Sequence, residues 1–372
     1  MKIGVVKELK DNEYRVGCIP TAVAELVARG NEVIIETQAG VGSGFSDEDY
    51  QAAGAKVVKT AEEVWTNVDM IYKVKEIFPQ EFKYLRDDLI VFTYIHSNAH
   101  PEQTDALLNS HCTSIAYEDV DDDHGKFPLL LPMSELAGRG GFLAALHFQQ
   151  TIFGGPGKLL CNVAGDKAPV ITVLGCGVSG TAICEMANAW GCKVNMFDVN
   201  YNRMLELRER FTNVNFIFSN RKNLQSVLPE TDVIFNCILW PKDRKDHVLY
   251  KEDLKLMHKG AMVVDVACDD NGAVETCQST THADPIYYAE GIMHYAVDNI
   301  PAAFAQTAST TLCNATLPHA IAMATKGVEK ALKDNKHLRR GLTTYDGKLY
   351  LLETAKKQNR EWNDPDKLVE SF

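Results

Sequence analysis

The chain has 372 residues, of which 45% are hydrophobic and 24% charged, and its formal net charge is -12 at pH 7. This length is sufficient for two domains, and the acidic balance excludes the basic surface that nucleic-acid binding requires. No run of residues approaches the ~20 apolar residues of a membrane span, and the first residues lack the apolar core of a signal peptide. We therefore expect a cytoplasmic protein without a nucleic-acid or membrane partner.

Ten cysteines are scattered along the chain, and no pair of them has Cys-x-x-Cys spacing. Several lie inside apolar strand or helix patterns, where a cysteine behaves as a small buried hydrophobic residue. The spacing indicates reduced thiols rather than a disulfide framework or a metal site.

Residues 1–130 alternate short β-rich runs with amphipathic stretches. Ser46 to Asp49 has the pattern of a capping box that opens a helix. The alternation is typical of a parallel α/β domain, and this half carries no nucleotide-binding motif. The predicted strands are residues 2–6, 32–36, 70–75, 89–95 and 113–117.

The second half begins with a glycine-rich pattern that follows a β-branched run over residues 170–174. In Gly175-Cys-Gly-Val-Ser-Gly180, the first glycine permits a tight turn and Gly177 lets the backbone approach a pyrophosphate. Gly180 allows close packing of helix on strand, and the helix predicted over residues 181–190 offers unpaired N–H groups at its start. The pattern therefore predicts a dinucleotide site.

The next predicted strand, residues 193–198, ends in Asp198 and completes a βαβ unit. A carboxylate at this point reaches the ribose of the adenosine half of a dinucleotide. Because a 2′-phosphate would meet like charge there, Asp198 favours NAD over NADP. The nearby Arg203 leaves open that an arginine governs the ribose instead.

Further strands are predicted at residues 215–218, 233–238, 262–267 and 294–297, and long helices at residues 132–150 and 317–332. We interpret both helices as crossovers between domains, with the tail packing back on the first domain. The predicted fold is α/β, with two Rossmann-like doubly wound domains, a cleft between them and a discontinuous N-terminal domain. We expect residues 1–130 plus 305–372 to form the substrate domain and residues 131–304 to bind the cofactor.

Charged residues at the predicted strand ends of the first half are candidate substrate ligands. Arg15 lies in the loop after the first strand, and arginine binds a carboxylate through two parallel hydrogen bonds. Lys73 and Lys75 close an apolar strand, whose alternation sends both to the same face. Considered singly, an arginine or lysine at such a position is more often a solvated surface residue.

His96 ends the apolar strand predicted over residues 89–95. Histidine titrates near neutral pH, so it could act as a general acid and base, although a core or rim histidine with a purely structural role is the commoner case. Asp269 and Asp270 follow the strand at residues 262–267, where a turn is the simpler interpretation.

Longer segments around these positions resemble L-alanine dehydrogenases over roughly residues 1–350. The matching segments include Asn12-Glu-Tyr-Arg15, Lys73-Val-Lys-Glu76, Phe92-Thr-Tyr-Ile-His96, Pro132-Met-Ser-Glu-Leu-Ala-Gly-Arg139, Val264-Asp-Val-Ala-Cys-Asp269 and Asn314-Ala-Thr-Leu-Pro318. The resemblance implies reversible, NAD-linked oxidative deamination of L-alanine to pyruvate and ammonium, carried out by a homohexamer.

The resemblance also implies roles for individual residues. Arg15 and Lys75 would hold the carboxylate and the keto oxygen of the substrate. His96 would move protons to and from the carbinolamine, and Asp269 would help to place the ammonia and the histidine. The cofactor-binding positions would be Ser134, Gly175, Gly177, Val178, Ser179, Gly180, Asp198, Arg203, Ser219, Leu239 and Asn299.

Three segments depart from the usual family sequence. Residues 237–246, Cys-Ile-Leu-Trp-Pro-Lys-Asp-Arg-Lys-Asp, are bulkier and more charged than the family's Val-Leu-Ile-Pro-Gly loop, and residues 298–309 and Ser97-Asn98 also differ. These changes leave open a relative that reduces imines of pyruvate and amino acids, of the carboxyethylornithine synthase or saccharopine dehydrogenase type. An NAD(H)-binding module of a proton-translocating transhydrogenase is a further alternative.

Overall fold

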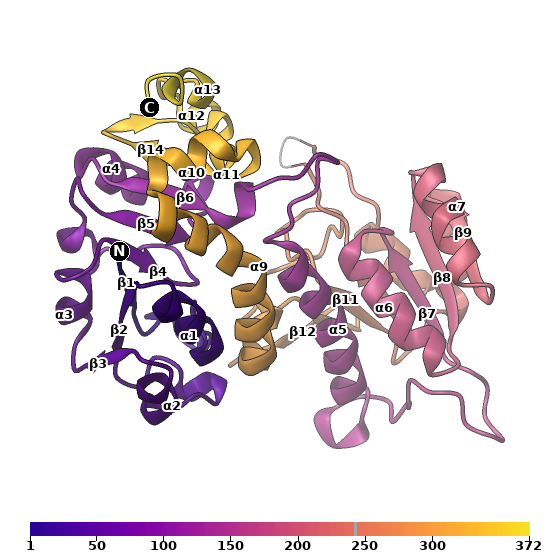
Figure 1. Cartoon of the computed structure of the whole chain (residues 1–372). Helices are drawn as coiled ribbons and strands as arrows, with labels where there is room; N and C mark the ends of the chain where they lie inside the picture. The colour runs from indigo at the N-terminus through magenta and orange to yellow at the C-terminus, as the bar shows by residue number, and fades with distance from the viewer. Residues whose placement is uncertain (242–243) are drawn as a thin grey trace. The chain divides into compact units, whose positions relative to one another are not determined.

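The computed structural model describes residues 1–241 and 244–372, so Lys242 and Asp243 of the departing loop lie outside the described residues. The chain divides into two compact units (Figure 1). Unit 1 comprises Met1–Pro132 and Phe304–Phe372, and unit 2 comprises Met133–Ala303.

Unit 1 is built on an eight-stranded sheet with the order β15-β14-β6-β5-β4-β1-β2-β3. The first six strands pair in parallel, as predicted, whereas β14 runs antiparallel to β6. The tail therefore supplies the end of the N-terminal sheet, which confirms the discontinuous domain. The strands are β1 (Lys2–Val5), β2 (Glu32–Glu36), β3 (Lys56–Val58), β4 (Met70–Tyr72), β5 (Ile90–Thr93), β6 (Thr113–Ala116), β14 (Leu342–Tyr345) and β15 (Lys348–Leu349).

The longest helix of unit 1, α9 (Ala305–Lys326), corrects the helix predicted over residues 317–332. It begins earlier, at Ala305, and within it Thr310 and Thr311 donate their hydroxyls to carbonyls one turn back, which satisfies these polar side chains inside a helix. It ends at Gly327, whose φ of 84° interrupts the helical backbone. The other α-helices are α1 (Pro20–Ala28), α2 (Asp47–Ala52), α3 (Ala61–Trp65), α4 (Pro101–Asn109), α10 (Val328–Asp334), α11 (Lys336–Arg340), α12 (Leu352–Gln358) and α13 (Pro365–Leu368).

The predicted capping box opens α2. The Ser46 hydroxyl accepts the N–H of Asp49, and the Asp49 carboxylate accepts the N–H of Ser46. Val64, Trp65, Leu89 and Val91 belong to a buried apolar cluster of unit 1, which joins helix α3 to the sheet. This core holds the strand ends that carry the candidate substrate residues.

Unit 2 is built on a seven-stranded sheet with the order β12-β13-β11-β10-β7-β8-β9. All its pairs are parallel except β12 with β13. The chain winds from β7 outward to β9 and then returns to β10 on the other side of β7, so β7 marks a topological switch point, where α/β sheets bind ligands. The strands are β7 (Val170–Leu174), β8 (Lys193–Asp198), β9 (Val214–Phe218), β10 (Val233–Asn236), β11 (Met262–Asp265), β12 (Ile286–Ala289) and β13 (Ile292–Tyr295).

The helices of unit 2 include α6 (Val178–Ala189), α7 (Tyr201–Arg210) and α8 (Arg221–Val227), and the long helix α5 (Leu131–Phe148) leads into the unit. Helix α6 begins three residues before the predicted start, directly after Gly177. The sequence prediction missed β12 and placed the final parallel strand slightly too late. Within residues 1–241 and 244–372, no helix is long and apolar enough to cross a membrane.

Candidate active site

Arg15, Lys75 and His96 follow three neighbouring strands of unit 1. Strands β1, β4 and β5 are adjacent and parallel, so their carboxyl ends meet at one edge of the sheet. Lys75 was expected as the last residue of its strand and His96 directly after its strand, but β4 ends at Tyr72 and β5 at Thr93. Both residues therefore lie in loops beyond the strand ends, the usual location of ligand-binding groups in α/β folds.

The Arg15 guanidinium is buried and held by Glu13. Its Nε donates to Glu13 Oε1 at 2.6 Å, and its Nη2 donates to Oε2 at 2.5 Å. Burial lowers the pKa of Arg15, but the hydrogen bonds and charge of Glu13 outweigh burial and raise this pKa above its usual range. A Cβ on Gly17 would lie 2.7 Å from the Tyr72 carbonyl, so a glycine lets this loop pass close to the end of β4.

Lys73 and Lys75 make different contacts. Lys73 is fully buried, and its Nζ donates to both oxygens of Glu81 at 2.8 and 2.9 Å and lies 3.6 Å from Glu8 Oε2. Lys75 Nζ lies 3.2 Å from Glu76 Oε2. Because β4 ends before both lysines, the alternation expected from a strand does not apply to them. Lys73 has a structural ion pair, whereas Lys75 stands nearer the surface.

His96 has a backbone φ of 50°, in the left-handed region. The rings of Tyr94 and His96 stack with centroids 5.8 Å apart. Glu118 accepts the backbone N–H groups of Ile95 and His96, and its Oε1 lies 3.6 Å from His96 Nδ1. A strained backbone, an aromatic ring and an acid therefore fix the position of the imidazole.

Glu118 and Asp119 were not identified from the sequence. Burial raises the pKa of Glu118 to about 7 and the pKa of Asp119 to about 8. They could have been found as an acidic pair directly after the apolar strand predicted over residues 113–117. His96 was identified in the same way, as a titratable residue directly after an apolar strand. Glu8 is a third missed acid: burial raises its pKa to about 7, and it accepts the N–H of Val74 at 2.6 Å.

The glycine turn of unit 2 lies between β7 and α6. Gly175 has a φ of 98°, a conformation that favours glycine. A Cβ on Gly180 would lie 1.9 Å from the Gly175 carbonyl oxygen, whereas a Cβ on Gly177 would meet no described atom within 4 Å. The close packing at Gly180 and the open space at Gly177 fit a pyrophosphate at the start of α6.

Helix α5 packs against the first turn of α6. A Cβ on Gly138 would lie 2.3 Å from the Ser179 carbonyl oxygen, and the Ser179 hydroxyl donates to the Ser134 carbonyl at 2.7 Å. Ser134 and Ser179 therefore lie together beside the glycine turn. Val178, the first residue of α6, is partly exposed there.

Asp198 and Arg203 both support the glycine turn. Asp198 Oδ2 accepts the N–H of Cys176 at 2.6 Å, and Oδ1 accepts the N–H of Asn200 at 2.8 Å. Arg203 Nε donates to the Cys176 carbonyl at 3.0 Å, and its Nη1 lies 2.8 Å from Glu206. The guanidinium of Arg203 is thus directed to the backbone of the turn and to a neighbouring acid.

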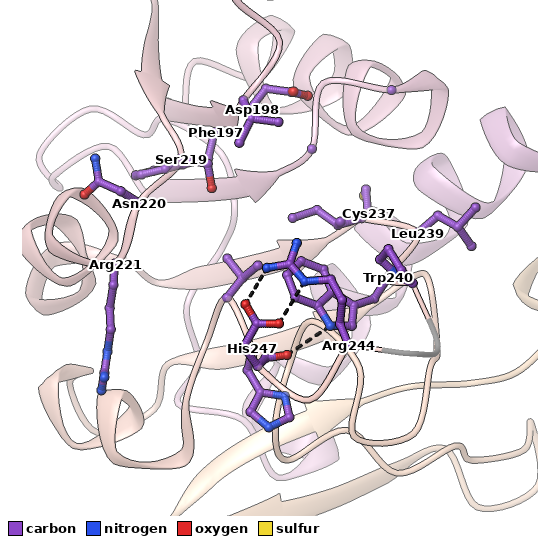
Figure 2. A pocket seen from close by; sticks show the side chains of 17 residues that line it. Phe197, Asp198, Ser219, Asn220, Arg221, Cys237, Leu239, Trp240, Arg244 and His247 are labelled. Carbon is purple, nitrogen blue, oxygen red and sulfur yellow. Dashed lines mark hydrogen bonds and ion pairs between the residues drawn. The ribbon is translucent and has the colours of Figure 1, made fainter.

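A cavity of about 470 Å³ extends from the glycine turn (Figure 2). This volume lies within the ~300–1,000 Å³ typical of small-molecule sites. Five predicted cofactor residues line it: Gly175, Gly177, Asp198, Ser219 and Leu239. Trp240 and Arg244 of the departing loop line it as well, so they border the same cavity as the glycine turn and Asp198.

The predicted Asp269 and Asn299 lie in other loops of unit 2. The turn at Asp269 is closed by the Gly272 N–H, which donates to the Asp269 carbonyl at 2.8 Å. Asp269 Oδ2 is buried and has no hydrogen-bond partner within residues 1–241 and 244–372. Asn299 has a φ of 73°, and its carbonyl lies 3.1 Å from His282 Nε2.

All ten cysteines are free, and seven of them are buried. Among the residues that the structure describes, no group of three or more histidine, cysteine, aspartate or glutamate side chains could hold a metal ion.

Comparisons with known proteins agree with this geometry. Family models described as Alanine dehydrogenase/PNT, N-terminal domain, and Alanine dehydrogenase/PNT, C-terminal domain, match residues 4–137 and 142–351. The chain is 42% identical to an alanine dehydrogenase of Staphylococcus epidermidis over 349 residues, which are 93% of this chain and 94% of the relative. It is 39% identical to the alanine dehydrogenase of Bacillus subtilis over 372 residues, which are 100% of this chain and 98% of the relative. A solved structure of an L-alanine dehydrogenase superposes with a TM-score of 0.93 at 38% identity, covering 96% of this chain and 99% of that one. The chain therefore belongs to the alanine dehydrogenase/PNT family.

Proposed function

We propose that the chain catalyses the reversible reaction of L-alanine, NAD⁺ and water to give pyruvate, ammonium, NADH and a proton. The observation that carries the proposal is the gathering of Arg15, Lys75 and His96 at the carboxyl ends of three adjacent parallel strands. Two cations and one imidazole at a single sheet edge suit a small 2-oxo acid. Full-length identity to alanine dehydrogenases supports the same reaction.

The glycine turn and Asp198 support a nicotinamide dinucleotide as cofactor. The N–H groups at the start of α6 would bind the pyrophosphate, and the Asp198 carboxylate would bind the adenosine ribose. When it is bound, NAD supplies the hydride acceptor. We propose NAD rather than NADP, because Asp198 repels a 2′-phosphate and Arg203 is directed to the Cys176 carbonyl.

Arg15 and Lys75 would hold the substrate. Arg15 is suited to the carboxylate, because Glu13 fixes the plane of its guanidinium and keeps it charged. Lys75 would polarise the keto oxygen. Both cations are in place before the substrate arrives, so little reorganisation is needed as charge develops on the oxygen.

His96 would transfer the protons that accompany addition and loss of water. In the oxidative direction, water adds to the imine carbon, and the imidazole takes the proton of that water as the carbinolamine forms. The carbinolamine then loses ammonia, and its hydroxyl proton leaves as the carbonyl forms. Asp269 has a buried carboxylate oxygen without a described partner, which is suited to receive the positively charged ammonium group.

The imine-reductase alternative needs a larger and more polar substrate pocket, for which the Trp240 loop was one candidate. That loop lines the cavity that also contains Asp198 and Ser219. Because we propose that Asp198 and Ser219 bind the cofactor, Trp240 and Arg244 would lie beside the dinucleotide, and they give no support to a larger substrate pocket.

The decisive experiment is a substrate screen with the purified full-length protein. Reduction of NAD is followed with a panel of L-amino acids, and oxidation of NADH is followed with pyruvate plus ammonium or plus amino acids. The proposal expects L-alanine to have the highest kcat/KM, and ammonium to be the preferred nitrogen donor. Faster NADH oxidation with pyruvate plus a second amino acid than with ammonium would favour imine reduction instead.

A homohexamer, as the family resemblance implies, and a cytoplasmic location both stay predictions. Light scattering of the purified protein measures the number of subunits directly.

A further inference from the structure

The loop in which this chain departs from the family sequence forms one wall of the Asp198 cavity. Ile238, Leu239, Trp240, Pro241 and Arg244 line the cavity on that side. Figure 2 shows Arg244 lying against Trp240, with Asp198 and Ser219 elsewhere around the same space. We refer to Trp240, Arg244 and Asp246 together as the Trp240 wall.

The Trp240 wall is held together by three internal contacts. The Arg244 guanidinium lies over the indole of Trp240 at 4.1 Å from the ring centroid. Arg244 Nε donates to Asp246 Oδ1 at 2.8 Å, and its Nη2 donates to Oδ2. The indole N–H donates to the Asp246 carbonyl at 3.0 Å. Asp246 therefore fixes one edge of the guanidinium, and the indole of Trp240 fixes one face.

Exposure shows which part of this wall a ligand would meet. Trp240 is only 9% exposed, whereas the Arg244 side chain is 48% exposed. The indole thus forms the base, and the guanidinium forms the outer layer. Hydrogen bonding to Arg244 lowers the pKa of Asp246, so the acid is ionised and offsets the charge of the arginine. The guanidinium of Arg244 is planar, and the ion pair of Arg244 with Asp246 has no net charge. Such a surface suits an uncharged aromatic ring better than a phosphate.

The cavity has a place for each part of an adenosine diphosphate. Gly175 and Gly177 suit the pyrophosphate and Asp198 suits the ribose, so the base must use the remaining lining. Nucleobases stack on planar guanidinium groups, and a group already held in place loses little conformational entropy on binding.

We propose that Arg244, supported by Trp240 and Asp246, is a specificity-determining residue that stacks on the adenine of the dinucleotide. This inference rests on the proposed function, because it requires a dinucleotide at Asp198. It assigns to this chain a base-binding surface made by residues that are bulkier and more charged than those of the usual family loop.

The test is calorimetric titration of the full-length protein with NADH and with ADP-ribose, which lacks the nicotinamide. Arg244→Ala should raise the Kd of both ligands about tenfold, the loss expected for one stacking contact. Arg244→Lys should also weaken both, because an ammonium keeps the charge but has no plane. Arg208→Ala is the matched control, since Arg208 is an exposed arginine of α7 outside the cavity lining.

The outcomes separate the two proposals. Wild-type affinities in Arg244→Ala would overturn the stacking role and leave the proposed function intact. Wild-type affinities in Arg244→Lys would show that the charge of residue 244 is sufficient for binding, and would overturn the stacking role as well. If the wild-type protein bound neither ligand, both proposals would fall. Unchanged thermal unfolding of the variants would exclude a loss of fold as the cause of weaker binding.

Discussion

Glu118 accepts the backbone N–H of His96 through Oε1, and the same oxygen lies 3.6 Å from Nδ1 of the His96 ring. One acid therefore supports both the left-handed backbone of His96 and its imidazole. Burial raises the pKa of Glu118 to about 7, which places its ionisation in the range where imidazoles titrate. The protonation of Glu118 and that of His96 are thus expected to influence each other.

Glu118→Gln should change the pH dependence of catalysis more than the maximal rate. The amide oxygen can still accept the N–H groups of Ile95 and His96, but the side chain no longer titrates. We expect the kcat/KM profile for pyruvate between pH 5.5 and 9 to lose an ionisation near 7. A profile identical to that of the wild type would show that Glu118 does not influence the reacting groups.

The same variant should alter the dependence of stability on pH. The folded-state pKa of Glu118 is raised from 4.5 to about 7, so between these values the folded protein binds its proton more tightly than the unfolded chain. The free energy of unfolding should therefore fall as pH rises through this window, by up to ~1.4 kcal/mol per pH unit for one group. In Glu118→Gln, the free energy of unfolding should fall less steeply with pH than in the wild type. Urea titrations at pH 5, 6 and 7 measure this difference.

Two glycines of the turn provide a matched pair. Gly180→Ala should destabilise the protein by roughly 3 kcal/mol or more, because its Cβ would lie 1.9 Å from the Gly175 carbonyl oxygen. Gly177→Ala should fold normally, since its Cβ meets no described atom within 4 Å, yet it should weaken NADH binding by obstructing the pyrophosphate. Thermal unfolding and NADH titration distinguish the two effects. A Gly177→Ala protein with normal NADH affinity would place the pyrophosphate elsewhere.

Arg15→Lys should impair substrate binding without affecting the cofactor. Lysine still provides a cation for the buried Glu13, but it loses the planar pair of donors that a carboxylate requires. The expected loss is ~1.5–3 kcal/mol, seen as a lower kcat/KM for pyruvate with an unchanged Kd for NADH. Arg29→Lys, at an exposed ion pair with Glu25, is the control. Normal pyruvate kinetics in Arg15→Lys would assign Arg15 a structural role only.

Asp198→Asn should narrow the preference for NAD over NADP. Asparagine keeps an oxygen that can accept the Cys176 N–H but removes the charge that repels a 2′-phosphate. The ratio of kcat/KM for the two cofactors measures the effect. If the wild type uses both equally and Arg203→Ala reduces only NADP use, Arg203 governs the ribose site.

The sequence predicted the architecture well where a pattern was local. The glycine turn, the capping box at Ser46 and the alternation of strands and helices each depend on a few consecutive residues. The start of α9 was missed because Thr310 and Thr311 lower helix propensity, and only the helical geometry shows their hydroxyls bonded to carbonyls one turn back. Pairing of β14 with β6 joins residues more than 200 positions apart, which no local pattern indicates.

The candidate site was predicted only in part. Arg15, Lys75 and His96 were found because each is a distinctive residue type after an apolar run. Glu118 was missed because an acid after a strand is usually a solvated turn residue. Its importance comes from burial and from the backbone N–H groups that it accepts, and both depend on the folded loops around it.

The antiparallel pairing of β14 with β6 has a consequence for biosynthesis. Until residues 342–345 have left the ribosome, the β6 edge of the N-terminal sheet has no partner for its backbone groups. Residues 133–303 form a continuous unit and can complete their sheet first. The nascent N-terminal segment thus keeps one edge of β6 exposed throughout synthesis of unit 2, while its other edge pairs with β5. Another chain could pair with that exposed edge during this interval.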